Sequence, residues 1–162
     1  MPAQVNKKPA GYHTVTPYLV VDDGARAIEF YKKAFGATET VRMAGPDGKI
    51  GHAEFKIGDS FVMLSDEMMG NRSAKALGGS PVGIFLYVDD VDAVFKQAVD
   101  AGGTSEMPPA DMFWGDRFGR LTDPFGHKWS LATHIEDVSP EEMKKRMQTA
   151  MSQSAQAGAQ AS

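Results

Sequence analysis

Apolar residues recur at every second position in some stretches of this chain and at helical spacing in others. Period-two alternation is typical of a half-buried strand, whereas apolar residues along one helical stripe predict an amphipathic helix. The strand pattern, bounded by turn residues, covers residues 14–21, 38–43, 50–57, 61–65, 83–88, 104–108, 116–122 and 127–132. The helical pattern covers residues 25–35 and 91–101, and capping signals predict a third helix at residues 140–147.

The order of one strand, one helix and three strands occurs twice along the chain. An aspartate pair precedes each of the first two helices as an N-cap, and glycine ends each helix. The pairs lie in matching segments, Val-Val-Asp-Asp at residues 20–23 and Tyr-Val-Asp-Asp at residues 87–90. We therefore predict an internal duplication of the α+β class, with one β-α-β-β-β module at residues 13–66 and a second at residues 82–134.

Four segments lie outside these modules. Residues 1–12 are polar with two prolines and predict a loose N-terminal arm. Residues 67–81 lack a clear period and predict a connector or a mobile lid. Residues 135–150 contain the predicted C-terminal helix, and the Ser, Ala, Gln and Gly residues of 151–162 predict a disordered tail.

Composition excludes several classes of protein. The 162 residues are 42% hydrophobic, enough for a core, and the formal net charge is −4. That charge, without a long basic run, argues against nucleic acid and membrane surfaces as partners. The absence of cysteine excludes disulfides and thiolate metal sites. No apolar run approaches the roughly 20 residues of a membrane span, and no apolar leader is evident, so we expect a cytoplasmic protein.

The last two strands of the second module form a predicted hairpin with unusual polar residues. Asp-Pro-Phe-Gly at residues 123–126 is a tight turn, because proline presets φ and glycine accepts a positive φ. The hairpin carries Asp116, Arg117, Arg120, His127 and Trp129. Stability alone requires only β-branched and aromatic residues here, so this set favours a binding surface.

Three motifs together carry a resemblance to a known family. They are Tyr-Leu-Val-Val-Asp-Asp at residues 18–23, Ile-Glu-Phe-Tyr-Lys-Lys-Ala-Phe-Gly at residues 28–36, and Asp-Pro-Phe-Gly-His-Lys-Trp at residues 123–129. Residues 12–147 resemble the vicinal oxygen chelate superfamily, which includes glyoxalase I, bleomycin-resistance proteins and extradiol dioxygenases, and within it the PhnB-like branch. The resemblance implies mixed sheets that curl round a shared cavity, and a homodimer.

Metal-dependent members of that superfamily hold their ion with His and Glu side chains at four strand positions. The matching positions of this chain are Thr16, Gly83, Ser130 and either Met63 or Ser65. Such weak neutral donors do not hold a divalent ion without carboxylate or imidazole partners. The resemblance therefore implies that the usual metal site is lost, and no cofactor is expected.

Strand alternation assigns the two faces of the predicted sheets. Ala53, Phe55 and Ile57 share the face that packs on helices, which leaves His52 and Glu54 on the other face. The same reasoning and the hairpin rim give the remaining cavity candidates: Thr16, Tyr18, Phe85, Tyr87, Trp114, Asp116, Phe118 and Arg120. Aromatic walls with a few polar groups suit a flat or amphiphilic organic ligand. The alternative is a strand face on which His52 and Glu54 simply meet water.

Two histidines outside this face leave a second interpretation open. With His52 and Glu54, His127 and His134 are candidates for a relocated divalent-metal site. Strand parity places His127 with Trp129 on the helix-packed face, which instead favours a hydrogen-bonded structural histidine.

Arginines of the closing hairpin also have two interpretations. Arg117 or Arg120 has the planar fork that clamps a carboxylate or phosphate. Alternatively, ion pairs between Asp116 and Arg117 or between Asp123 and Arg120 only stabilise the hairpin.

Three functions follow from these observations. The leading one is binding of a small aromatic or cationic molecule, with Tyr18, Phe85, Tyr87 and Trp114 stacking and with Glu54, Asp116 and Arg120 as polar anchors. The second is a lyase, isomerase or dioxygenase-like enzyme that uses His52 and Glu54, either with a displaced metal or as a metal-free acid/base pair. The third is an interaction protein that assembles through its C-terminal helix.

Overall fold

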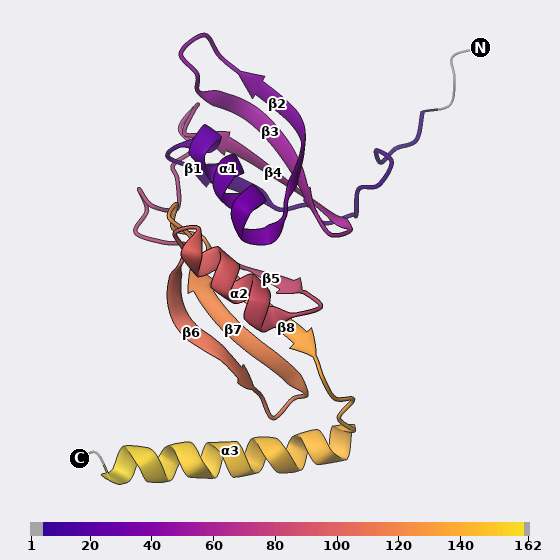
Figure 1. Cartoon of the computed structure of the whole chain (residues 1–162), viewed down its shortest axis with the longest axis vertical. Helices are drawn as coiled ribbons and strands as arrows, with labels where there is room; N and C mark the ends of the chain where they lie inside the picture. The colour runs from indigo at the N-terminus through magenta and orange to yellow at the C-terminus, as the bar shows by residue number, and fades with distance from the viewer. Residues whose placement is uncertain (1–4, 161–162) are drawn as a thin grey trace.

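Two β-α-β-β-β modules follow one another in the computed structural model, which describes residues 5–160 (Figure 1). The first module contains β1 (Tyr18–Val21), α1 (Gly24–Phe35), β2 (Thr38–Ala44), β3 (Ile50–Ile57) and β4 (Ser60–Asp66). The second contains β5 (Gly83–Tyr87), α2 (Val91–Asp100), β6 (Thr104–Asp111), β7 (Asp116–Thr122) and β8 (Lys128–His134). The helix α3 (Pro140–Gln160) follows β8. The predicted α+β architecture with a C-terminal helix is confirmed.

Each module has one open, four-stranded mixed sheet. The strand orders are β1-β4-β3-β2 and β5-β8-β7-β6, so the strand before each helix lies at a sheet edge beside the last strand of its module. That pair is parallel in both modules, and the other neighbours are antiparallel. The connector at residues 67–81 contains neither helix nor strand. β1 and β5 are therefore equivalent edge strands of the two modules.

The helices α1 and α2 begin at the predicted aspartate caps. Asp23 Oδ1 accepts a hydrogen bond from Arg26 N at 3.0 Å, and Asp90 Oδ1 accepts one from Ala93 N at 3.0 Å. α1 ends at Gly36, whose φ of 66° lies in the left-handed region that favours glycine. Both helices lie on one face of their sheets and leave the opposite faces uncovered by helix (Figure 1).

Aromatic side chains from both modules meet in one core. Tyr31 and Phe35 of α1 contact Trp129 of β8, with ring centroids 5.3 Å and 4.6 Å apart. Phe125 of the hairpin turn lies 6.1 Å from Phe30. All but Phe35 of these side chains are buried, so the hairpin of the second module packs directly on the helix of the first.

The strand limits differ from the predicted ones by two residues or more at three strand ends. β1 begins at Tyr18 rather than at residue 14, because Pro17 has no N–H to donate, although its carbonyl accepts from Met63 N at 2.9 Å. β6 and β8 extend beyond their predicted ends, to residues 111 and 134, because both continue to pair with β7. Pairing between strands, which the sequence pattern does not contain, sets these limits.

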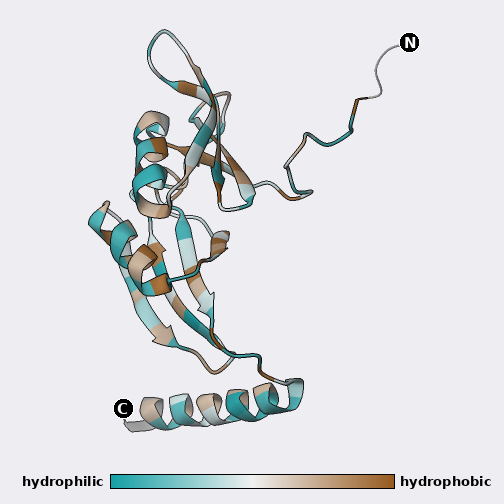
Figure 2. Cartoon of the chain, turned by 45° about the vertical axis from the view of Figure 1, so that its right-hand side comes forward, coloured by the Kyte–Doolittle hydropathy of each residue, from teal (hydrophilic) through white to brown (hydrophobic). Residues whose placement is uncertain are grey.

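The C-terminal helix is longer than the sequence predicts. The predicted helix segment ends near residue 150 with disorder beyond it, whereas α3 continues to Gln160, so the disorder prediction is wrong for residues 151–160. Residues 161–162 lie outside the described part of the chain. This segment lacks proline and is rich in Ala and Gln, and extending a nucleated helix needs only one residue per added hydrogen bond. Hydrophilic and weakly hydrophobic residues alternate along α3 (Figure 2).

Within residues 5–160, none of the helices has both the length and the apolar character that crossing a bilayer requires.

Candidate functional site

The face of the first sheet opposite α1 carries the candidate polar residues of β3. Ala53, Phe55 and Ile57 are buried against the helix side, as predicted from their alternation. His52 and Glu54 lie on the opposite face, with side chains 26% and 17% exposed. These values mean that the two residues are neither fully solvated nor sealed in the core, because neighbouring aromatic side chains cover part of them.

Hydrogen bonds join four side chains on this face into one network. His52 Nε2 lies 2.9 Å from Glu54 Oε1, and Tyr18 Oη lies 3.3 Å from His52 Nδ1. A neutral His52 with its proton on Nε2 donates to Glu54 and accepts from Tyr18. Tyr12 Oη donates to the other carboxylate oxygen of Glu54. Hydrogen bonds from His52 and Tyr12 hold the pKa of Glu54 below its usual value, so Glu54 is a carboxylate at neutral pH.

The equivalent face of the second sheet is organised around Asp116, which is 4% exposed. Tyr87 Oη and Trp114 Nε1 both donate to Asp116 Oδ2 at 3.1 Å, and His134 Nδ1 lies 2.8 Å from Oδ1. Burial and the neighbouring Asp116 carboxylate raise the pKa of Tyr87. Hydrogen bonds with Asp116 and Asp137 raise the pKa of His134, which favours the imidazolium beside the carboxylate.

Aromatic rings continue this second cluster towards β5. The Phe85 ring centroid lies 5.0 Å from that of Tyr87 and 5.7 Å from that of Phe118, and Trp114 makes an edge contact with Phe118 at 5.8 Å. Phe85 and Tyr87 are 47% and 67% exposed. Two aromatic rings of one edge strand are thus held in place by neighbours yet leave much of their surface open to a ligand.

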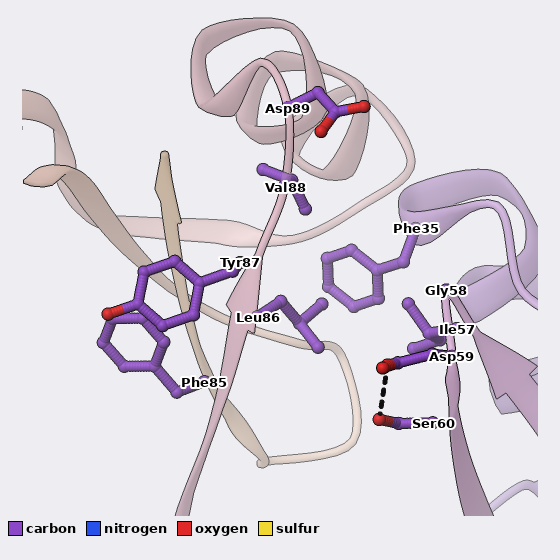
Figure 3. Close-up of a pocket in the computed structure, with 10 residues that line it drawn as sticks. All are labelled: Phe35, Ile57, Gly58, Asp59, Ser60, Phe85, Leu86, Tyr87, Val88 and Asp89. Atoms are coloured by element: carbon purple, nitrogen blue, oxygen red, sulfur yellow. Dashed lines mark hydrogen bonds between the residues drawn. The ribbon is translucent and has the colours of Figure 1, made fainter. Parts of the chain in front are cut away.

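Two open pockets lie where the modules meet, and both are lined by Phe85. One, of about 600 Å³, lies between the Gly58–Asp59 turn of the first module and residues 85–89 of the second (Figure 3). Its aromatic side chains are Phe35, Phe85 and Tyr87. The other, of about 540 Å³, is lined by Tyr18 of β1 and Phe85 of β5 together with Val15, Ser80, Val82 and His127. The structure therefore brings Tyr18 and Phe85, one from each sheet, to one opening.

Arg120 and Thr16, predicted as cavity residues, lie outside these clusters. Arg120 Nε of β7 pairs with Glu106 Oε2 of the neighbouring edge strand β6 at 2.9 Å. Thr16 Oγ1 donates to His13 O at 3.3 Å in the segment before β1. Contacts with Arg120, Lys128 and Thr122 lower the pKa of Glu106, with the hydrogen bond from Thr122 as the largest cause. The Arg120 guanidinium therefore already has a carboxylate partner, Glu106, which strand alternation alone does not identify.

Neither ion pair proposed for the hairpin is present. Arg117 pairs with Asp92 at 2.6 Å and with Asp111 at 2.9 Å, rather than with Asp116. Asp123 accepts hydrogen bonds from buried donors of the core rather than from Arg120. Both predicted pairs are wrong. Asp116 and Arg117 are adjacent in β7, so their side chains point to opposite faces of the sheet, and Arg117 reaches Asp92 of α2. Asp123 is 4% exposed among core donors, whereas Arg120 is a more exposed residue of β7 that pairs with Glu106.

The histidines of the relocated metal hypothesis do not converge. His127 is 8% exposed and its Nε2 lies 3.1 Å from Val20 O, so it has the burial and the hydrogen-bond contact that parity predicts for a structural histidine. His134 belongs to the Asp116 cluster of the other module. Among the residues that the structure describes, no three His, Cys, Asp or Glu side chains are arranged to hold a metal ion.

The positions that match the metal ligands of the superfamily that the sequence resembles have donors that do not fit a divalent cation. They are Thr16, Met63 or Ser65, Gly83 and Ser130, which offer at most hydroxyl or thioether groups. Ser65 is also 2% exposed. The residues at these positions therefore do not fit the ion that the metal-dependent members hold.

Tyr12 is a site residue that the sequence pattern does not identify. It falls in the predicted loose arm, yet its ring stacks on Phe61 of β4 with centroids 4.1 Å apart and planes 9° apart. Phe61 shares the open sheet face with Lys56, its partner in the strand register. The one signal in the sequence is an aromatic residue within an otherwise polar segment, which does not specify where the ring packs.

Known proteins resemble this chain over most of its length. Residues 11–131 match the family model described as the glyoxalase/bleomycin resistance protein/dioxygenase superfamily. A Mycobacterium bovis protein of uncharacterised function is 47% identical over 148 residues, or 88% of this chain and 95% of that protein.

Solved structures give the same assignment of fold. The structure of an Arabidopsis thaliana gene product is 31% identical with a TM-score of 0.62, and the match covers 74% of this chain and 98% of that chain. The PhnB protein of Bacillus cereus, at 20% identity and a TM-score of 0.60, matches 75% of this chain and 99% of its own.

Proposed function

The chain belongs to the glyoxalase/bleomycin resistance protein/dioxygenase superfamily, and from that membership we propose that it binds a small aromatic organic molecule. The observation that carries this proposal is the pair of half-exposed rings, Tyr18 and Phe85, that line one pocket from two different sheets. Rings facing a shared opening provide stacking surfaces for a flat ligand.

Polar groups at either side of the opening supply orientation. Glu54 is connected to Tyr18 by hydrogen bonds through His52. Asp116 accepts a hydrogen bond from Tyr87, whose ring contacts that of Phe85. Both carboxylates have hydrogen-bond partners, so they do not need a ligand for stability. Their charge and the formal net charge of −4 favour a ligand that carries a hydrogen-bond donor or a positive charge over an anionic one.

A second copy of the chain is the protein partner that we propose. Apolar side chains remain exposed around β1 and β5, with Val15 at 82% and Val82 at 71% exposure beside Tyr18, Phe85 and Tyr87. Another protomer covering this surface removes it from water and encloses the ligand. Light scattering on the full chain tests this, and truncation after Met147 establishes whether α3 contributes to assembly.

The second candidate function is metal-free acid/base catalysis at His52, in a lyase or isomerase reaction. The observation favouring it is the chain of contacts from Tyr18 through His52 to Glu54. Glu54 fixes the imidazole orientation, while His52 Nδ1 accepts a proton from a hydroxyl. Tyr18 is 48% exposed, so its hydroxyl can exchange protons with a bound molecule. Turnover lost in His52→Gln with ligand binding retained identifies this function.

Calorimetry with a panel of aromatic compounds, cationic and neutral, tests the binding proposal. Saturable binding by the wild-type chain is expected, weakened about tenfold by Phe85→Ala and by Tyr18→Ala because each removes a stacking surface. Met151→Ala removes an exposed apolar side chain of α3 and serves as the matched control, with no expected effect. Absence of saturable binding throughout the panel rejects the proposal.

A further inference from the structure

The N-terminal arm is held against the first sheet chiefly by one side chain. The Tyr12 ring lies parallel to Phe61 at 4.1 Å, and its hydroxyl donates to Glu54. Within the arm, Tyr12 N donates to Pro9 O at 3.2 Å. Otherwise, in the described chain, residues 5–13 approach the sheet by hydrogen bonding only where His13 Nδ1 lies 3.5 Å from Ser60 Oγ. Tyr12 thus holds the arm to the sheet through one stacked ring and one hydrogen-bond donor, which are the contacts that a phenolic ligand makes.

We propose that Tyr12 occupies a binding site for an external phenol and acts as a displaceable lid over it. This inference rests on the proposed function, because it assigns one end of that ligand to the open face of the first sheet. The phenolic ring of the ligand replaces Tyr12 on Phe61, and its hydroxyl replaces Tyr12 Oη at Glu54 Oε2.

The partners of Tyr12 define the ligand's chemistry. Glu54 Oε1 is taken by His52, so Oε2 is the carboxylate oxygen that receives a donor from outside the sheet. Phe61 presents a ring face at the distance of stacking. Lys56 Nζ lies 5.5 Å from the Phe61 centroid, so a cationic ring here meets a like charge. A neutral ring with a hydroxyl donates to Glu54, stacks on Phe61 and brings no positive charge close to Lys56.

The protonation state of Tyr12 agrees with this choice. Burial and the Glu54 carboxylate raise its pKa to about 12, so the phenol keeps its proton at neutral pH. A ligand phenol in the same position experiences the same carboxylate and likewise remains a donor. Phenolates and benzoates, which bring a second negative charge to Glu54, are therefore excluded from this position.

Displacement makes a quantitative prediction about variants. An internal competitor lowers the apparent affinity by the fraction of molecules in which the site is free. In Tyr12→Ala the site is always free, so the Kd of p-cresol falls at least about threefold relative to wild type. Tyr12→Phe keeps the ring but loses the bond to Glu54, so its Kd lies between the two.

Calorimetric titration of the full chain with p-cresol measures these values. Adding Phe61→Ala to the Tyr12→Ala variant weakens binding about tenfold, because the stacking partner is lost. Toluene, which lacks the hydroxyl, and benzyltrimethylammonium, which is cationic, bind Tyr12→Ala more weakly than p-cresol. Nuclear Overhauser contacts between p-cresol and the Phe61 ring place the ligand directly.

Two results overturn the inference. One is a folded Tyr12→Ala variant that binds p-cresol no more tightly than wild type, which makes Tyr12 a purely structural clasp; Tyr12→Phe supplies the same comparison where Tyr12→Ala does not fold. The other is p-cresol binding that is insensitive to Phe61. Aromatic binding that depends on Phe85 but on neither Tyr12 nor Phe61 leaves the proposed function standing alone, whereas no aromatic binding by any variant rejects both.

Discussion

Tyr31 Oη of α1 donates to Asp123 Oδ2 of the closing turn at 2.7 Å, across the boundary between the two modules. Asp123 also accepts from Trp129 Nε1 at 2.8 Å and from the backbone N–H groups of Phe125 and His127 at 2.8 Å and 3.0 Å. One buried carboxylate therefore shapes the turn and joins it to the helix of the other module. Burial and the Asp123 charge raise the pKa of Tyr31, which keeps its hydroxyl a donor.

Removing the Tyr31 hydroxyl is expected to loosen this junction. Tyr31→Phe removes one of the hydrogen bonds to the buried Asp123 carboxylate, which lowers the free energy of unfolding by about 1–3 kcal/mol. Urea titration measures the change. Tyr18→Phe is the matched control, because its hydroxyl lies on a half-exposed ring, and its expected effect stays below about 0.5 kcal/mol. Equal effects of the two substitutions contradict a special role for Asp123.

The sequence predicts the elements and the faces better than the contacts. Alternation in β3 assigns Phe55 to the core and Glu54 to the open face, because a strand turns successive side chains to opposite sides. Parity does not say which side chain on a neighbouring element reaches Glu54. Tyr12 comes from a segment without periodicity, and Glu106 binds Arg120 across a strand pair with an irregular register.

Gly115 is expected to tolerate no side chain. Its φ is 99°, and a Cβ there would lie 2.1 Å from Glu136 O. Gly115→Ala must move the segment leading to α3 and disturb the adjacent Asp116, so a loss of more than about 3 kcal/mol is expected. Gly48→Ala is the control, since its φ is 79° but nothing lies within 4 Å of the added carbon.

For that control, only the backbone conformation opposes alanine, at about 1–2 kcal/mol. Thermal unfolding of both variants compares the cost of the backbone conformation alone, in Gly48→Ala, with that cost plus the steric clash with Glu136 O, in Gly115→Ala. If Gly115→Ala loses no more stability than Gly48→Ala, the close approach of the 115 and 136 backbones is not a constraint in solution.

Stability is expected to fall with rising pH through the titration of His134. Hydrogen bonds with Asp116 and Asp137 raise its folded-state pKa above the ordinary 6.5. The protonated form is thus favoured by folding, so its contribution is fully present below pH 6.5 and is lost as pH rises through the folded-state pKa. The Tm difference between wild type and His134→Gln should be larger at pH 5.5 than at pH 8.5.

Asp137→Asn provides a check on the source of this effect. It removes one of the two carboxylates, so the pH range over which the His134 contribution persists should shrink toward pH 6.5. A Tm difference that does not change with pH rules out the ionic form of the contact between His134 and Asp116.

Chelation is expected to leave ligand binding unchanged. The superfamily's metal positions hold Thr16, Gly83 and Ser130, and their neutral donors compete poorly with water for a divalent ion. Protein purified without chelators should contain metal far below stoichiometry, equally in wild type and Glu54→Gln, and EDTA should not alter the affinity for an aromatic probe. Near-stoichiometric metal that disappears in Glu54→Gln would instead identify Glu54 as a ligand and make metal-assisted catalysis the leading function.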